Sequence, residues 1–173
     1  MDGLRRPRRW VNLTWTGGQD NADRGRLRAL RQIINLRKTH PTINTFSRRI
    51  LRQYHVANRD YPAQVRALQS WMQGNIGWIL EPGDQFVDPI WTLYNGWGDC
   101  DCHSALFGAL LESIRIPTNL TILRRNGRGV HVFVKVGFPT HQPRVWIPAE
   151  TSLIKPLGWS PVNAPRSELR QVV

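Results

Sequence analysis

The chain of 173 residues is 40% hydrophobic and carries eight tryptophans. It is therefore long and apolar enough to bury a core, and the class of disordered chains is excluded. Its formal net charge of +12 rests on 24 basic and 12 acidic residues, and Lys38, Lys135 and Lys155 are the only lysines. Arginine binds planar anions in a bidentate way, so the charge indicates a polyanionic partner or an acidic protein surface. The arginine usage of a GC-rich genome explains the same composition equally well.

The sequence shows no sign of a membrane or secretory segment. No apolar run approaches the about 18 residues of a membrane-spanning helix, and the basic N-terminus lacks the apolar region of a secretory signal. Cys100 and Cys102 flank a single residue, a spacing that does not easily close a structural disulfide. We therefore expect reduced thiols in a cytoplasmic setting and no membrane partner.

Residues 1–22 are predicted to form an extended, basic N-terminal arm. Its arginines cluster ahead of the first tryptophan, a pattern typical of segments that contact nucleic acid or an acidic partner. The candidate partner-binding residues of this arm are Arg5, Arg6, Arg8 and Arg9.

Three helices are predicted to follow, at residues 23–38, 42–54 and 62–76, because apolar residues recur along one face of each segment. Gln69 falls within the buried stripe of the third helix. Arginines on the outer faces are interpreted as solvated positions. Residues 79–93 are predicted to be a loop, because two proline-containing turns interrupt them.

A glycine-rich turn and a helix are predicted between Asn95 and Pro117. Asp99 and Asp101 suit the N-cap and the first turn, because their carboxylates accept backbone N–H groups that have no helical partner. Cys100 then lies where the turn enters a largely buried helix. A thiol at that place feels the positive end of the helix dipole, which favours the nucleophilic thiolate.

Strands are predicted after Pro117, at residues 119–124, 130–136 and 144–148, since the pattern changes to period two with β-branched residues. Asn126–Gly127 is predicted to be the turn of a hairpin. Helices followed by strands indicate an α+β fold. Residues 161–173 are predicted to form a C-terminal tail.

The stretch around Cys100 resembles the transglutaminase-like superfamily, in which the nucleophile lies in a Gly-Asp-Cys-Asp-Asp-type turn that opens a helix. The likeness is to short members encoded in phages and prophages. It implies a papain-like core, with one central helix packed on a small antiparallel sheet. The resemblance covers residues 60–160 and implies one domain at 23–160, with a helical part at 23–80 and a catalytic core at 81–160. The motifs that carry it are residues 65–71, 75–78, 88–93, 95–117, 129–136, 145–151 and 156–159.

The resemblance implies a Cys–His–acid site. Cys100 would be the nucleophile, and His131 would take the thiol proton and later pass it to the leaving group. Glu150 would hold the imidazole in its working tautomer. Taken singly, His131 is equally well read as a core histidine and Glu150 as a turn carboxylate.

The oxyanion donors are less well defined. The backbone N–H of Cys100 is a natural donor to a developing oxyanion, because it lies at a helix start. The candidate supporting residues are Trp91, Trp97 and Asp99.

The sequence departs from the family pattern at two positions. The acid is usually Asp, whereas Glu150 is one methylene longer. The residue two after the nucleophile is usually Asp, whereas this chain has Cys102, which is an alternative thiol. We favour Cys100 because it has the Gly-Asp-Cys context, and we interpret Cys102 as a buried small residue.

We expect no metal and no cofactor. Cys100, Cys102, His103 and His131 are residue types that bind zinc, but Cys-x-Cys-His lacks the usual spacing of zinc ligands. The chemistry that the resemblance implies is thiol-based acyl transfer on protein amide bonds through a thioester. Hydrolysis and cross-linking both remain open, because the acceptor depends on water access to the site.

As a phage-encoded enzyme linked to virion assembly, the chain would work in the host cytoplasm and in the virion. Two further functions are compatible with the sequence. In the first, the chain is a structural component of the capsid, neck or tail that uses the fold as a packing module among partner subunits. Its arginine content and the two motif departures favour that reading. Nucleic-acid binding by the arginine-rich N-terminal region is the third interpretation.

Overall fold

A computed structural model describes residues 10–11, 19–80 and 86–163 of the chain. The predicted arginine cluster of the N-terminal arm and residues 164–173 of the predicted tail lie outside the described residues. Within the tail, Pro161–Asn163 forms a single 3-10 turn.

Helices α1 (Gln19–Arg37), α2 (Pro41–Gln53) and α3 (Tyr61–Asn75) form where the apolar periodicity predicts them. The α1 helix begins a few residues earlier than predicted, so it includes the end of the segment predicted to be an arm. Polar caps define two of the starts, because His40 and Asp60 accept hydrogen bonds from first-turn amides of α2 and α3.

The predicted loop at residues 79–93 is wrong in its second half. Strand β3 (Phe86–Val87) and helix α4 (Pro89–Asn95) occupy it. The Asp88 side chain accepts the amide of the second helical residue, and a proline in the first turn costs no hydrogen bond. The Asp-Pro pair therefore starts a helix here. Gly96 ends it in the left-handed conformation, at φ 76°.

Helix α5 (Cys100–Ser113) is the centre of the molecule, and every residue of its first twelve is buried. Asp99 caps it by accepting the amides of the second and third helical residues, both at 3.0 Å. Gly108 lets α1 approach closely, because a Cβ at this position would lie 2.6 Å from the Ile34 side chain.

Strands β5 (Thr118–Arg125), β6 (Arg128–Phe138) and β7 (Val145–Ala149) form one antiparallel sheet in the order β5-β6-β7. The predicted hairpin turn is confirmed: Asn126 and Gly127 both have positive φ, 50° and 76°, as a type I′ turn requires.

Two short pairings complete the described strands. Strand β1 (Trp10–Val11) pairs with β3, and β2 (Gly77–Trp78) pairs in parallel with β4 (Trp97–Gly98). The second pairing precedes the start of α5 directly, so it fixes the turn that leads to Cys100.

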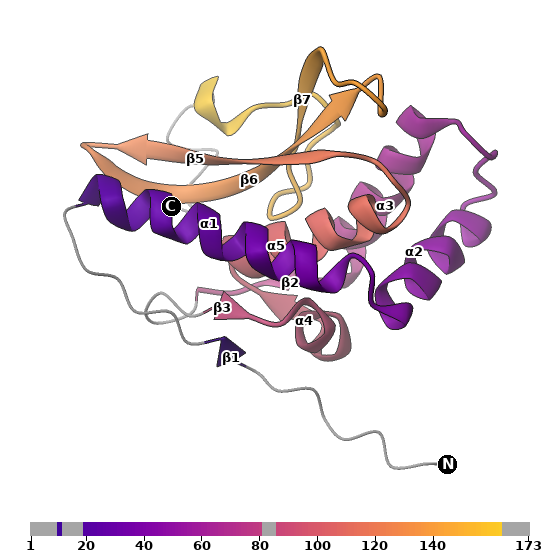
Figure 1. The fold of residues 1–173 in the computed structure, drawn as a ribbon, viewed down its shortest axis with the longest axis horizontal. Coiled ribbons are helices and arrows are strands. Elements are labelled where there is room, and N and C mark those ends of the chain that lie inside the picture. Colours follow the sequence, from indigo (N-terminus) through magenta and orange to yellow (C-terminus); the bar gives the residue numbers. More distant parts are fainter. Residues whose placement is uncertain (1–9, 12–18, 81–85, 164–173) are drawn as a thin grey trace.

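The sheet forms one layer, and α1 and α5 lie against one of its faces (Figure 1). Apolar residues of α5, such as Leu106 and Leu110, share one core with Val132 and Val134 of β6. This arrangement confirms the predicted α+β fold, with a central helix packed on a small antiparallel sheet. None of the described helices is both long and apolar enough to cross a lipid bilayer.

Candidate active site

The thiol of Cys100 lies at the N-terminus of α5, against the strand that carries His131. Cys100 is 9% exposed. The backbone N–H of Val132 points at its sulfur and favours the thiolate. One turn further along α5, the Ser104 hydroxyl donates to the Val132 carbonyl at 3.1 Å. Both contacts fix the first turn of α5 to the peptide that follows His131.

His131 and Glu150 form a buried pair. Their Nε2 and Oε2 atoms are 2.7 Å apart, and the two side chains are 0% and 1% exposed. The other ring nitrogen, Nδ1, is buried and makes no hydrogen bond with any described residue. The ring of Phe133 stacks beside His131, with centroids 6.2 Å apart. Nε2 is therefore occupied by the carboxylate, whereas Nδ1 is available to accept or donate a proton.

The Glu150 carboxylate carries its negative charge in this setting. Burial alone would raise its pKa, but hydrogen bonds, first that from His131 and then those from the backbone of Ser152 and Thr151, contribute to lowering it, and the pKa lies below its ordinary value. The second carboxylate oxygen, Oε1, accepts the backbone N–H of Ser152 at 2.7 Å. Both oxygens are therefore occupied, and the carboxylate is held in one orientation.

Two glutamines of α3 hold the backbone on which Glu150 sits. The Nε2 atoms of Gln69 and Gln73 each donate to the Glu150 carbonyl at 2.9 Å. Gln73 also reaches the carbonyls of Leu153 and Lys155, at 2.9 and 2.8 Å. Sequence reasoning placed Gln69 in a buried stripe and gave it no role at the site. The signal in the sequence that could have indicated this role is the spacing of Gln69 and Gln73, which are four residues apart and therefore lie on the same face of the helix.

The electrostatics around Cys100 correct the expectation of a preformed thiolate. Burial raises the pKa of the thiol above its ordinary value, and the negative charges of Asp101 and Asp99 raise it further. The Val132 amide and the positive charge of Arg26 act in the opposite direction but are outweighed. The helix start is therefore not sufficient to ionise the thiol, and Cys100 rests in its protonated form.

An ion pair ties α1 to the start of α5. Arg26 Nε lies 2.6 Å from Asp101 Oδ2, and the aspartate side chain is only 2% exposed. The contact joins residues far apart in the sequence, and sequence reasoning did not identify Arg26. It places one positive charge beside the two carboxylates that flank the thiol.

The alternative thiol, Cys102, points away from β6. It is 1% exposed, and a Cβ on Gly98 would lie 2.3 Å from its own Cβ, so its side chain packs on β4. Two residues along a helix correspond to a rotation of about 200°. The structure therefore brings Cys100, and not Cys102, to the strand of His131.

The predicted aromatic supports lie together in the segment before α5. Trp91 of α4 and Trp97 of β4 pack edge to face, with ring centroids 4.8 Å apart and planes at 90°. Each is partly exposed. Their packing steadies the turn that delivers Asp99 and Cys100.

His103 is a second buried histidine, one turn along α5. Its Nε2 lies 3.5 Å from the Gly77 carbonyl, and Nδ1 is buried without a partner among the described residues. Burial lowers its pKa, against the charge of the nearby Glu150 carboxylate. His103 is therefore neutral. In the described part of the chain, no group of three or more His, Cys, Asp or Glu side chains is arranged to hold a metal ion.

A buried helix that opens on a cysteine, packed on an antiparallel sheet with a histidine–carboxylate pair, defines a papain-like α+β fold. A model of the transglutaminase-like superfamily matches residues 45–164. That match covers more than half of the chain, so the chain belongs to the transglutaminase-like superfamily.

Solved structures share this fold. A crystal structure of a candidate cysteine protease from Cytophaga hutchinsonii is 16% identical, with a TM-score of 0.51 over 70% of this chain and 42% of its own. A candidate protease from Parabacteroides distasonis is 14% identical, with a TM-score of 0.50 over 65% of this chain and 24% of its own. The chain spans less than half the length of either protein. No curated protein matches it significantly.

Proposed function

We propose that the protein is a cysteine-nucleophile amide hydrolase or acyltransferase, with Cys100, His131 and Glu150 as its catalytic residues. The observation that carries this proposal is the buried 2.7 Å pair of His131 and Glu150, which leaves the other imidazole nitrogen without a partner among the described residues. The next residue of the same strand, Val132, contacts the Cys100 sulfur through its backbone N–H.

His131 acts as the base through Nδ1. In the resting state Nε2–H donates to Glu150, so Nδ1 carries the lone pair. Because burial keeps Cys100 protonated, Nδ1 takes the Sγ proton as sulfur attacks the amide carbonyl. The imidazolium that forms is stabilised by the ionised Glu150 carboxylate.

The remaining steps follow from the same groups. Attack forms the S–C bond and moves the carbonyl electrons onto oxygen. The intermediate then collapses, the C–N bond breaks, and Nδ1–H gives its proton to the departing amine. Water or another amine attacks the resulting thioester, and His131 takes the proton of the attacking group. The C–S bond then breaks, and Nδ1–H returns that proton to the departing sulfur, so Cys100 is released as the thiol.

The backbone N–H of Cys100 is suited to stabilise the oxyanion. The Asp99 side chain accepts the amides of Asp101 and Cys102 and not that of Cys100. The first amide of a helix has no partner within the helix. The positive end of the α5 dipole therefore faces the place where negative charge develops on the substrate oxygen.

We take protein amides as the substrate class and a phage-encoded role in virion assembly, in the host cytoplasm and the virion, as the biological setting. Family membership and two neighbours described as candidate proteases support the chemistry. The phage setting rests on the sequence resemblance alone.

A purely structural role is the second candidate, and one observation favours it. His131 and Glu150 are almost fully buried and Cys100 is 9% exposed, so the described residues close over the site. A closed site is what we would expect of a packing module that keeps the fold but has no catalytic activity. An active enzyme of this kind opens the site before substrate enters.

The test is capture of the acyl-enzyme. The protein is incubated with denatured casein, the thioester is trapped with hydroxylamine, and released hydroxamates are quantified. We expect turnover in the wild type and in Cys102→Ser, and none in Cys100→Ser. Folding of each variant is checked by circular dichroism. Absence of hydroxamate from a folded wild type, together with no labelling of Cys100 by a peptidyl vinyl sulfone, would support the structural role.

A further inference from the structure

The outer edge of β5 is an open strand edge. The strand lies at one end of the sheet, and no other described strand pairs with its outer side. The amide of Gly137 donates to the carbonyl of Pro117, and antiparallel pairing alternates inward and outward residues. The backbone groups of Thr118, Leu120 and Ile122 therefore point away from β6. Such an edge is a ready template for another strand.

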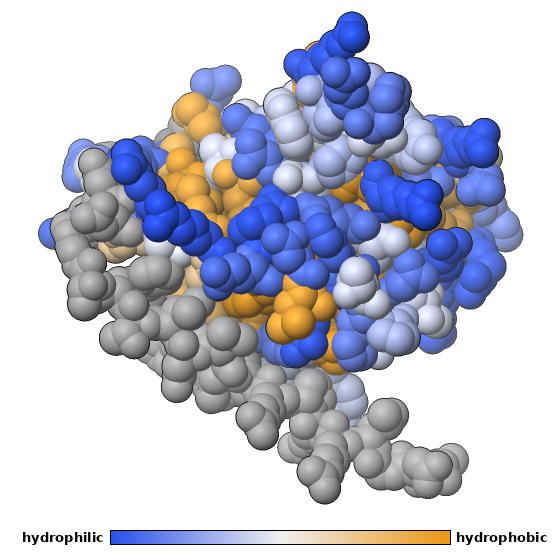
Figure 2. Space-filling model, in the orientation of Figure 1, coloured by the Kyte–Doolittle hydropathy of each residue, from blue (hydrophilic) through white to orange (hydrophobic). Residues whose placement is uncertain are grey.

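A groove follows this edge on the side of α1. It has a volume of about 410 Å³ and is lined by residues of α1 and β5. Leu27 and Leu120 supply apolar surface, while Arg28, Arg31 and Gln32 supply a polar rim. Figure 2 shows hydrophilic side chains along α1 beside apolar surface over the strands. A groove with an apolar floor, a basic wall and open backbone groups suits an extended peptide.

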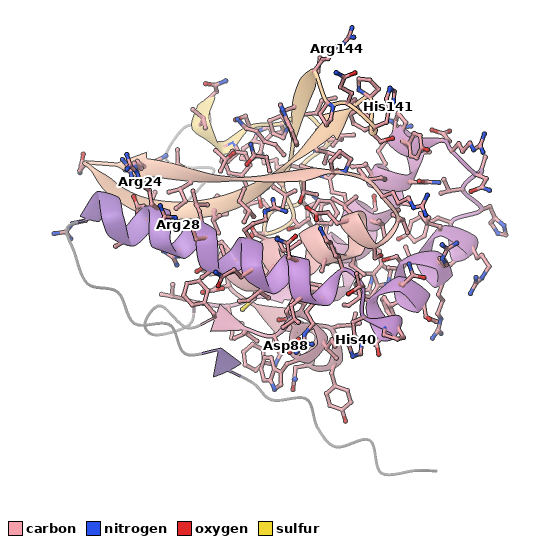
Figure 3. The ribbon with its side chains drawn as sticks, viewed as in Figure 1. Arg24, Arg28, His40, Asp88, His141 and Arg144 are labelled. Atoms are coloured by element: carbon pink, nitrogen blue, oxygen red, sulfur yellow. The ribbon has the colours of Figure 1, made fainter. Side chains whose placement is uncertain are left out.

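Helix α1 carries two arginines whose charges no described residue neutralises: Arg28, which lines the groove, and Arg24, one helical turn before it. Arg24 and Arg28 are exposed, and neither forms an ion pair with a described residue. Figure 3 shows both on α1, beside β5. Arg31 is different, because it pairs with Glu112 and donates to the outward carbonyl of Thr118 at 2.7 Å. The Thr118 carbonyl, one of the outward-facing backbone groups of β5, is thus occupied by the Arg31 guanidinium.

The spacing of the two unpaired arginines matches an extended chain. Four residues of a helix advance about 6 Å along its axis. Alternate residues of a strand, which lie on the same face, are about 6.8 Å apart. The α1 helix runs alongside β5 (Figure 1). Carboxylates at alternate positions of an added strand would therefore face Arg24 and Arg28 in turn.

We propose that the β5 edge and the α1 groove bind an extended acidic segment of a partner protein by strand addition. Its backbone pairs with Leu120 and Ile122, and its alternate acidic side chains face Arg24 and Arg28. The strand edge favours a peptide over nucleic acid, because a phosphate backbone offers no donors to the outward carbonyls. This surface is independent of the catalytic proposal.

The test uses a fluorescein-labelled peptide of alternating Glu and Thr, with binding followed by anisotropy on the full-length protein. The Arg24→Glu/Arg28→Glu variant is expected to bind about tenfold more weakly, as the loss of two exposed charge pairs implies. Its matched control is Arg49→Glu/Arg52→Glu, which makes the same change of charge on the exposed face of α2. That control is expected to bind within about twofold of the wild type.

Hydrogen exchange locates the peptide. Binding is expected to slow exchange at the amides of Leu120 and Ile122, and a peptide N-methylated at alternate residues is expected to lose that protection. The proposal is overturned if the peptide does not bind, if both double variants bind equally, or if the β5 amides are unaffected. It is also overturned if a single-stranded oligonucleotide, but not the peptide, binds the same arginines with a steep salt dependence.

Discussion

The two ends of α5 differ in the charged groups that surround their carboxylates. At the C-terminal end, Glu112 contacts Arg31, Lys38 and the Thr118 hydroxyl. At the N-terminal end, Asp99 and Asp101 lie beside a buried thiol, and the positive charge of Arg26 partly offsets their effect on it. Near this end, the Nδ1 atoms of His103 and His131 have no hydrogen-bond partner among the described residues. The C-terminal carboxylate is therefore surrounded by positive groups, whereas the N-terminal carboxylates lie beside a buried thiol whose ionisation they oppose.

The pKa directions express the same contrast. Burial alone would raise the pKa of Glu112, but the Thr118 hydrogen bond and the Arg31 charge more than offset it, so the pKa is lowered. At the other end, burial and the carboxylates act together and raise the pKa of Cys100. If the N-terminal cluster is the proposed active site, one helix carries a structural and a reactive cluster, and variants at each end should have separable effects.

The largest expected effect comes from Glu150→Gln. A glutamine amide can donate to Nε2, which moves the imidazole proton to Nδ1 and blocks the base. We expect the rate of hydroxamate formation to fall by about four orders of magnitude, as a wrong tautomer does in the Ser-His-Asp proteases. The thermal midpoint serves as the control for folding. A variant that keeps more than a tenth of the activity would contradict the assigned role of Glu150.

Glu112→Gln should affect stability and leave turnover unchanged. The substitution leaves Arg31 and Lys38 partly buried without a carboxylate, and we expect a loss of about 1–3 kcal/mol in the free energy of unfolding by urea. Because the folded pKa of Glu112 is lowered, its stabilisation is present above the unfolded pKa. It is lost as the pH falls through the folded pKa. The difference between wild type and variant should therefore shrink in acid, and a constant difference would argue against this pairing.

Gln73→Leu should lower the catalytic rate by more than its effect on the free energy of unfolding would explain. The substitution removes the Nε2 amide, which lies within hydrogen-bond distance of three carbonyls of the segment that starts at Glu150. We expect kcat to fall by about tenfold to a hundredfold, since small misplacements of a catalytic group are costly, while KM stays within about twofold. Gln73→Glu is not a suitable rescue, because it places a charge beside carbonyl oxygens. Gln53→Leu, at the exposed end of α2, is the matched control and should leave kcat unchanged.

Arg26→Gln is the mildest change. It removes the positive charge beside Asp101, so the pKa of Cys100 rises further. We expect the alkylation profile of Cys100 to move to higher pH by less than about one unit, because a single partly exposed ion pair has a modest effect. Arg66→Gln, an exposed residue of α3, is the control. An unshifted profile would mean that Asp101 is neutralised by another group.

Much of the fold could be predicted because its signals are local. Apolar periodicity marks α1, α2 and α3, and the Asn126–Gly127 turn sets the β5–β6 hairpin. The α4 helix was missed because an Asp-Pro pair starts turns and helices alike, and only the tertiary packing of α4 decides between them.

The motif order proposes Cys100, His131 and Glu150 as the site, and their roles stay a prediction. In the structure His131 pairs with Glu150, and the backbone N–H of the next residue, Val132, points at the Cys100 sulfur. The contacts of Gln73 and Arg26 join residues more than 70 positions apart, so no local pattern contains them. The raised pKa of the Cys100 thiol could not be predicted for the same reason, because burial of the thiol depends on the whole fold.

The most direct test of the account is the rate of iodoacetamide alkylation of Cys100 against pH. It is followed by mass-spectrometric site mapping, in Cys102→Ser and in Cys102→Ser/His131→Ala. The account predicts labelling near neutral pH that is about a hundredfold slower without His131. The two profiles should converge at alkaline pH, where hydroxide ionises the thiol directly. Equal rates and an ordinary thiol profile in both proteins would contradict a Cys100–His131 pair and leave the structural role.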